Sequence, residues 1–156
     1  MEYPVKHYDV IHSRDAILHM HDKSTLFKKL YDSLKPGGKL LITDYCRNSN
    51  EATSDAEFEE YVKNHNYDII SISQYELLLT NSGFANVVGV DISNKFSDIL
   101  KKELEILSHD DTKRKMKDLI GSKEYEVWYN LWKDKIDRVE DGHHVWGLFT
   151  ASKPIL

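Results

Sequence analysis

The 156 residues carry 26 acidic and 21 basic side chains, a formal net charge of -5 and 40% apolar residues. This composition is typical of one globular domain and argues against a bulk affinity for nucleic acid, because binding to a phosphate backbone normally requires a basic surface. The apolar runs are too short to span a bilayer and the first residues have no signal-peptide pattern, so we expect no membrane contact and a cytoplasmic location.

Cysteine and histidine usage gives no support to a metal site. Cys46 is the single cysteine, which excludes an internal disulfide and a site with two thiolate ligands. The pairs His19/His21 and His143/His144 each lack the second ligand cluster that a zinc site requires. We therefore predict no bound metal, whereas a small anionic ligand remains compatible with the composition.

The first predicted element is a buried strand around Val10 and Ile11, whose β-branched side chains suit such a position. It is followed by three polar side chains, Ser13, Arg14 and Asp15. Ligands of open parallel α/β sheets bind at the carboxyl ends of the strands, so these residues are candidates for a binding site. Since the strand resembles an interior one, we also expect a further part of the sheet upstream of it.

Asp15 and His19 are four residues apart and would share one face if a helical turn began at Asp15. A carboxylate and an imidazole on one face can hold an amine or move a proton. The alternative is that Asp15 only caps the helix and His19 lies on the surface. The spacing alone leaves both interpretations open.

The next segment predicts a helix and a second strand. Asp22 or Ser24 would cap the helix, and the sequence KPGG at residues 35–38 would end it and turn the chain. The strand over residues 39–45 would then pair with the first strand in a right-handed βαβ unit. Asp44 and Tyr45 are therefore expected at the same sheet edge as Asp15.

A polar loop at residues 46–55 is long enough to act as a lid. The short helix that follows carries Phe58, Tyr61 and Val62 and brings Tyr61 close to His65 and Tyr67. The cluster could bind a ligand, or it could be one packed aromatic face with a polar end.

The rest of the chain predicts a helix with a capping box of Ser73 and Glu76, closed by Gly83. A third strand at residues 86–92 and a helix at residues 94–108 come next. The lysine-rich residues 110–119 are interpreted as a solvated helix or loop. A long helix at residues 122–139 and a final strand at residues 144–152 complete the pattern.

Five ordered segments resemble the phosphoethanolamine N-methyltransferases of plants, nematodes and malaria parasites. They are SRDAILH at 13–19, LKPGG at 34–38, ITDYC at 42–46, EYVK at 60–63 and WGLF at 146–149. Together they span nearly the whole chain, which makes the match specific. The resemblance implies methylation of phosphoethanolamine toward phosphocholine, with S-adenosylmethionine as the cofactor and a small phosphobase as the partner.

The resemblance also implies roles for individual residues. Asp15 would hold the substrate amine and His19, paired with a tyrosine, would activate it, because an alkylammonium with a pKa of about 10 must lose a proton before it can attack a methyl group. Phenol hydroxyls and an ammonium group suit a phosphate dianion. The implied phosphate donors are Tyr45, Tyr61, Tyr67 and Lys135, and the residues beside the cofactor are Ser13 and Arg14.

Two departures from the family pattern matter. His65 stands where relatives carry an arginine, and it is a weaker, pH-dependent phosphate donor. The glycine-rich first βα turn, the acidic residue after the second strand and the tyrosine partner of His19 have no counterpart in this sequence. We therefore expect residues 1–156 to be a single domain that corresponds to the carboxyl-terminal half of a methyltransferase domain.

The expected fold is α/β, a partial class I (Rossmann-like) methyltransferase sheet with a helical lid. It would contain the last four strands in the order first, second, fourth, third, with the final strand antiparallel to its neighbours. Three functions stay open: a half-enzyme completed by another chain, a non-catalytic phosphobase-binding module, and a methyltransferase for another small acceptor. The edge of the first strand would pair with another copy of the chain or with a separate amino-terminal half.

Overall fold

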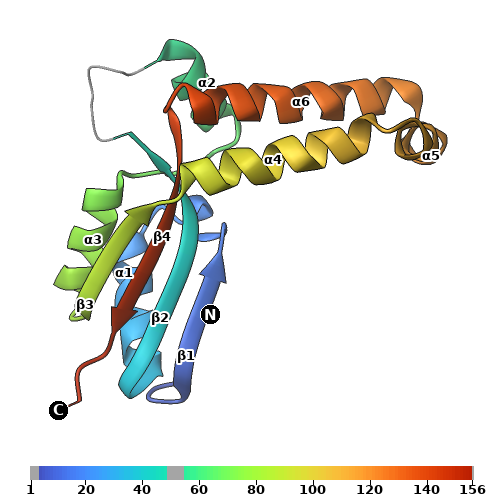
Figure 1. Ribbon diagram of the computed structural model, residues 1–156. Helices are drawn as coiled ribbons and strands as arrows, with labels where there is room; N and C mark the ends of the chain where they lie inside the picture. Colours follow the sequence, from blue (N-terminus) through green and yellow to red (C-terminus); the bar gives the residue numbers. More distant parts are fainter. Residues whose placement is uncertain (1–3, 49–54, 156) are drawn as a thin grey trace.

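A computed structural model of the chain describes residues 4–48 and 55–155, which form a four-stranded mixed sheet flanked by helices (Figure 1). The strand order is β1-β2-β4-β3; β1 and β2 are parallel, and β4 is antiparallel to both of its neighbours. The strands are β1 (Tyr8–Arg14), β2 (Leu34–Arg47), β3 (Ala85–Asp91) and β4 (His144–Ser152). The predicted α/β fold, strand order and antiparallel last strand are confirmed.

The helices form two groups. In Figure 1, α1 and α3 pack on one face of the sheet, whereas α4, α5 and α6 extend from its end as a helical arm. Their bounds are η1 (Ile17–His19), α1 (Lys23–Ser33), α2 (Ala56–Asn64), α3 (Ile72–Asn81), α4 (Ser93–Ser108), α5 (Asp110–Ile120) and α6 (Ser122–Glu140). The lysine-rich segment is therefore a helix, and no helix in the described ranges is long and apolar enough to cross a membrane.

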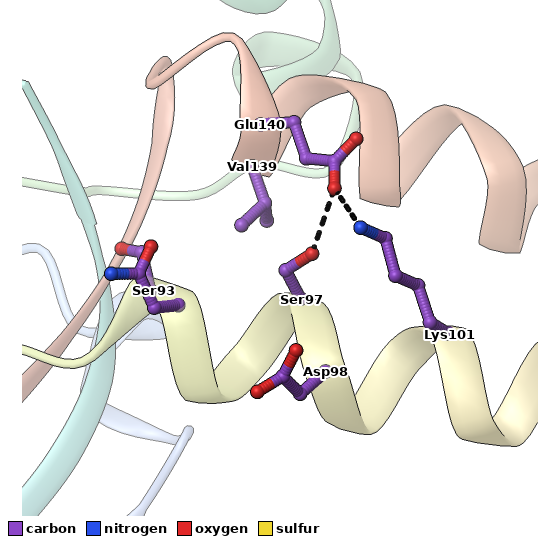
Figure 2. A pocket seen from close by; sticks show the side chains of 7 residues that line it. Ser93, Ser97, Asp98, Lys101, Val139 and Glu140 are labelled. Atoms are coloured by element: carbon purple, nitrogen blue, oxygen red, sulfur yellow. Dashed lines mark hydrogen bonds and ion pairs between the residues drawn. The ribbon is translucent and has the colours of Figure 1, made fainter.

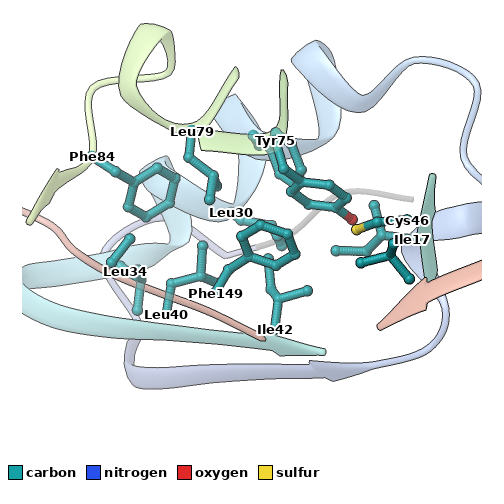
Figure 3. Packing of buried hydrophobic residues seen from close by; sticks show 13 residues of the cluster. Ile17, Leu30, Leu34, Leu40, Ile42, Cys46, Tyr75, Leu79, Phe84 and Phe149 are labelled. Atoms are coloured by element: carbon teal, nitrogen blue, oxygen red, sulfur yellow. The ribbon is translucent and has the colours of Figure 1, made fainter. Parts of the chain in front are cut away.

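The main core lies between the sheet and the pair α1 and α3. Leu30 and Leu79 come from the helices and meet Leu40, Ile42 and Phe149 from the strands (Figure 3). The ring of Tyr75 stacks on the ring of Phe149 at a centroid distance of 4.3 Å. This packing fixes the sheet on the helices and so determines where the carboxyl ends of β1 and β2 lie.

The opposite face of the sheet is open. Val10, Leu41, Val88 and Val90 alternate with the core-facing positions and are exposed by 59, 37, 50 and 45%. The prediction that Val10 lies in a buried strand is therefore wrong in this structure. Among the described residues β1 pairs with β2 alone, which makes β1 an edge strand whose apolar side chains meet solvent.

Helix starts follow local capping chemistry, with one correction. Asp22 caps α1, as predicted, and accepts a hydrogen bond from the Thr25 backbone at 3.0 Å. The capping box of α3, however, is formed by Ser71 with Gln74, two residues earlier than predicted. The carboxylate of Glu76 instead accepts a hydrogen bond from the Gly89 backbone at 2.7 Å and ties α3 to β3.

The predicted turn before the second strand is part of β2. Tyr8 pairs with Leu34 and Val10 with Lys39, so residues 35–38 bulge out of the ladder, with Gly37 at a φ of 79°. At its other end β2 continues to Arg47. Residues 49–54 of the predicted lid lie outside the described residues.

Candidate functional site

The carboxyl ends of β1 and β2 meet α2 and the last turns of α6, and most of the predicted site residues gather there. Tyr45, near the end of β2, is at the centre. Its ring lies 4.4 Å from the ring of His144 and 6.4 Å from that of Tyr67, measured between centroids. Lys135 of α6 donates a hydrogen bond from its Nζ to the Tyr45 hydroxyl at 3.2 Å. The strand and the long helix therefore place a phenol and an ammonium group side by side.

The aromatic residues of α2 and the segment after it complete this group. Ring centroids are 4.4 Å apart for Tyr61 and His65, 5.1 Å for His65 and Tyr67, and 5.9 Å for Tyr61 and Tyr67. The ring of His19 lies 5.2 Å from that of Tyr67. These contacts agree with a packed aromatic face. Tyr67 also lies beside Tyr45, which accepts the hydrogen bond from Lys135, so this face lies next to the Lys135 ammonium group.

Asp15 reaches the site in a way that the sequence did not predict. Its φ is 48°, and its N–H donates to the Thr43 carbonyl at 2.8 Å, which continues the pairing of β1 with β2. This pairing prevents a helix from starting at Asp15, and η1 begins only at Ile17 without any side-chain cap. The prediction of a shared helical face with His19 is wrong, and so is the alternative of Asp15 as a cap.

The carboxylate of Asp15 is nevertheless held firmly. Its Oδ1 accepts a hydrogen bond from the Trp146 indole Nε1 at 2.8 Å, and Arg14 forms an ion pair with it at 3.7 Å. Its negative charge also acts on Tyr45, where it adds to the rise in pKa caused by burial, and on Lys135, where it partly opposes the fall in pKa caused by burial. Asp15 therefore belongs to the same electrostatic site as these two side chains.

Burial sets the protonation states of the site. It raises the pKa of the Tyr45 phenol, helped by the charge of Asp15, and it raises the pKa of Tyr61 to about 12, helped by Tyr67. Both phenols therefore keep their protons at neutral pH and can donate hydrogen bonds. Burial also lowers the pKa of Lys135, and the nearby charge of Arg138 lowers it further.

Two side chains at the site were missed. The guanidinium carbon of Arg138 lies 4.0 Å from the ring centroid of Tyr61. His144 is only 1% exposed, and neither of its ring nitrogens has a hydrogen-bond partner among the described residues. The spacing of Arg138 three residues after Lys135 on one helix could have revealed the first. In the sequence His144 stands out only as half of a histidine pair, and nothing there indicates its burial beside Tyr45.

Ser13 and Arg14, the predicted cofactor neighbours, end β1 beside Asp15. Ser13 is half-buried and pairs in register with Ile42, whereas the side chain of Arg14 is 73% exposed. They lie at the end of the sheet that the prediction requires. Their role toward a cofactor stays a prediction.

A cavity of about 430 Å³ lies elsewhere, between α4 and the end of α6 (Figure 2). None of the predicted site residues lines it. Its Glu140 accepts a hydrogen bond from Ser97 at 3.0 Å and forms an ion pair with Lys101. Because this carboxylate is already paired, we place the candidate site at Tyr45 and Lys135. The described ranges contain no group of three or more side chains suited to hold a metal ion.

The sheet order and the site at its carboxyl end define the chain as an α/β protein of the class I methyltransferase type. A solved structure of this type, phosphoethanolamine N-methyltransferase 2 of Haemonchus contortus with phosphomonomethylethanolamine and S-adenosylhomocysteine, matches 98% of this chain with a TM-score of 0.91 and 31% identity. Residues 1–114 match the family described as a methyltransferase domain, and the chain belongs to this family.

Two curated relatives narrow the resemblance. Phosphoethanolamine N-methyltransferase 1 of Arabidopsis thaliana is 40% identical over 151 residues, which is 97% of this chain and 30% of the relative. The phosphoethanolamine N-methyltransferase of Plasmodium falciparum is 40% identical over 154 residues, 97% of this chain and 57% of the relative. The predicted resemblance is confirmed, and the chain spans about a third to just over half of the length of these relatives.

Proposed function

We propose that this chain binds the phosphobase in the S-adenosylmethionine-dependent methylation of phosphoethanolamine and its methylated intermediates, as the carboxyl-terminal half of a methyltransferase domain. The observation that carries the proposal is the hydrogen bond between Lys135 and Tyr45 inside an aromatic cluster that includes Tyr61 and Tyr67. The names of the relatives and the phosphobase bound by the Haemonchus contortus enzyme support it.

In this proposal the phosphate lies against α6 and the end of β2. Lys135 supplies positive charge, and the phenols of Tyr45, Tyr61 and Tyr67 donate hydrogen bonds to the phosphate oxygens. His65 lies on the exposed rim, where its Nδ1 is 2.8 Å from the Tyr61 carbonyl oxygen. It therefore has the most freedom to turn toward a ligand, and we assign it a supporting contact.

The amine end lies toward Asp15. Its carboxylate, oriented by Trp146, would attract the substrate ammonium group at the opposite end of the molecule from the phosphate. His19 is exposed beside Tyr67 and would accept the proton that the amine must lose before methyl transfer. Asp15 and His19 are thus the catalytic residues that we propose.

We propose that the described residues form only part of the site for S-adenosylmethionine. Ser13 and Arg14 offer one flank, and Arg14 is largely exposed. We propose that an amino-terminal half supplies the remaining contacts by pairing with the β1 edge and covering the exposed Val10 and Leu41; a second copy of this chain is the alternative partner. The free, buried Cys46 fits the reducing cytoplasm in which we place the protein.

The experiment that tests the phosphate site compares the variants Lys135→Ala and Lys133→Ala. Both remove one ammonium group from α6, but Lys133 is exposed and contributes to none of the contacts described above. Phosphocholine binding, measured by calorimetry, should weaken by about 1.5 to 3 kcal/mol in the first variant, the range for a hydrogen bond to a charged group. Equal affinities in the two variants would remove Lys135 from the site. Phosphocholine binding by the unmodified chain, without methyl transfer even when an amino-terminal half is added, would favour the non-catalytic module.

A further inference from the structure

We propose that Arg138 is a second cationic phosphate-binding residue of this chain, beside Lys135. The inference rests on the proposed function, because it concerns the same site. Arg138 lies on α6 three residues after Lys135, so both side chains leave the helix on one face. No role for Arg138 follows from the sequence motifs.

The position of the guanidinium group is the first argument. It stacks over the ring of Tyr61 at 4.0 Å, and its Nε is buried without a hydrogen-bond partner among the described residues. A buried donor without an acceptor is costly unless a ligand or water satisfies it. Because the guanidinium group lies against the ring of Tyr61, this contact holds the fork of N–H groups in place before a ligand arrives.

The surrounding charge is the second argument. The structure pairs Arg47, Lys101 and Arg114 each with a carboxylate. For Lys135 and Arg138 the described residues provide no ion pair within 4.0 Å, and the carboxylates of Asp15 and Glu103 act on Lys135 only from farther away. Two neighbouring cations without a contacting carboxylate suit a phosphate dianion, which would neutralise both.

His144 shows that the two cations face the same space. The charges of Lys135 and Arg138 both act on its imidazole, which lies 4.4 Å from the Tyr45 ring and 6.0 Å from the Tyr61 ring, between centroids. Its two ring nitrogens have no partner in the described part of the chain. Beside Tyr45 and Tyr61 there are therefore two buried donors without an acceptor among the described residues, the Nε–H of Arg138 and the one N–H of the neutral His144.

The test compares Arg138→Gln with Arg114→Gln, because each variant removes one guanidinium charge. Arg114 is exposed on α5 and paired with Asp111 at 2.8 Å, away from the site. Calorimetric titrations with phosphocholine and with inorganic phosphate should give at least about 10-fold weaker binding for Arg138→Gln and an unchanged constant for Arg114→Gln. Arg138→Lys should fall between them, because it keeps the charge but loses the fork. Thermal unfolding of each free variant checks that it is folded.

The outcomes separate this inference from the function on which it rests. Equal phosphocholine affinities of Arg138→Gln and Arg114→Gln, with binding intact in both, would overturn the role of Arg138 and leave the proposed function standing. Binding of inorganic phosphate that depends on Arg138, without any binding of phosphocholine, would support Arg138 and contradict the proposed function. An unmodified chain that binds neither probe would overturn both.

Discussion

The proposed phosphate end of the site and the end of β1 differ in how completely the chain holds their side chains. Tyr45 is half-buried, contacts three other aromatic rings and accepts a hydrogen bond from Lys135. Arg14, at the end of β1, is 73% exposed and has one ion pair, 3.7 Å long, with Asp15. The side chains of the proposed acceptor site are thus held by contacts within this chain, whereas the proposed flank toward the methyl donor has few contacts of its own.

The largest predicted effect comes from supplying the missing contacts toward the methyl donor. We predict that the chain alone gives no detectable methyl transfer and that mixing it with the amino-terminal half of a phosphoethanolamine N-methyltransferase restores turnover. Proximity of donor and acceptor can supply up to about 7 to 11 kcal/mol, but only when both are held in register. The measurement is transfer of a labelled methyl group to phosphoethanolamine.

The control for this experiment is Asp15→Asn in the mixed sample, which should lose most of the restored activity because the substrate ammonium group loses its carboxylate. Robust turnover by the purified chain without any added half would contradict the comparison. It would mean that Ser13, Arg14 and the residues after Tyr45 bind the donor by themselves.

A second prediction concerns the protonation of His144, which lies beside Tyr45 at the proposed acceptor end. Burial, with the charges of Lys135 and Arg138, lowers the pKa of His144 to about 3. In the unfolded chain this imidazole takes up a proton below pH 6.5, whereas in the folded chain it stays neutral until about pH 3. The unfolded state therefore binds more protons in this window, and His144 makes the free energy of unfolding fall as the pH falls.

The variant His144→Gln lacks this effect. Its free energy of unfolding should decrease less than that of the unmodified chain between pH 6.5 and pH 4, by roughly 3 kcal/mol at about 1.4 kcal/mol per pH unit. Asp44, whose pKa burial raises to about 6, titrates in both proteins and cancels in the comparison. Urea denaturation across the pH range measures the difference, with the half-buried His143→Gln as the control. Parallel pH profiles would show that His144 is not held neutral.

The smallest predicted effect concerns the amine end. Trp146→Phe removes the indole N–H that orients Asp15 and should weaken phosphoethanolamine binding by about 1 kcal/mol, the usual contribution of one hydrogen bond. Inorganic phosphate, which has no amine, should bind as before. Trp128→Phe is the matched control, because this indole is on the helical arm and is 51% exposed. A loss for both ligands would indicate that Trp146 only supports the packing of the site.

Much of this arrangement could be predicted from the sequence, because it depends on motifs and on chain connectivity. The parallel pairing of β1 and β2 follows from their short connection, the position of Tyr45 follows from its place at the end of the second predicted strand, and Lys135 was implied by the resemblance. The conformation of Asp15 could not be predicted, since it results from a backbone hydrogen bond to Thr43 on another strand. The exposure of Val10 could not be predicted either, because β-branched residues alone do not reveal which neighbours cover them.

The remaining errors come from competition between local and tertiary contacts. Ser73 and Glu76 have the spacing of a capping box, but Glu76 is drawn to the Gly89 backbone of β3, and Ser71 caps the helix instead. Arg138 belongs to no motif; its spacing after Lys135 places both on one face of α6, but its contact with Tyr61 exists only once α2 packs against α6. Residues whose role arises from packing between distant segments were the ones missed.

The most direct test of the proposed acceptor-binding role is to titrate the unmodified chain with phosphocholine and with S-adenosylmethionine in separate calorimetric experiments. We predict saturable binding of phosphocholine, because all of its proposed phosphate contacts lie within this chain. We predict much weaker binding of S-adenosylmethionine, since Ser13 and Arg14 are the residues that we propose beside it. Binding of S-adenosylmethionine as tight as that of phosphocholine would contradict the claim that this chain is the acceptor-binding half.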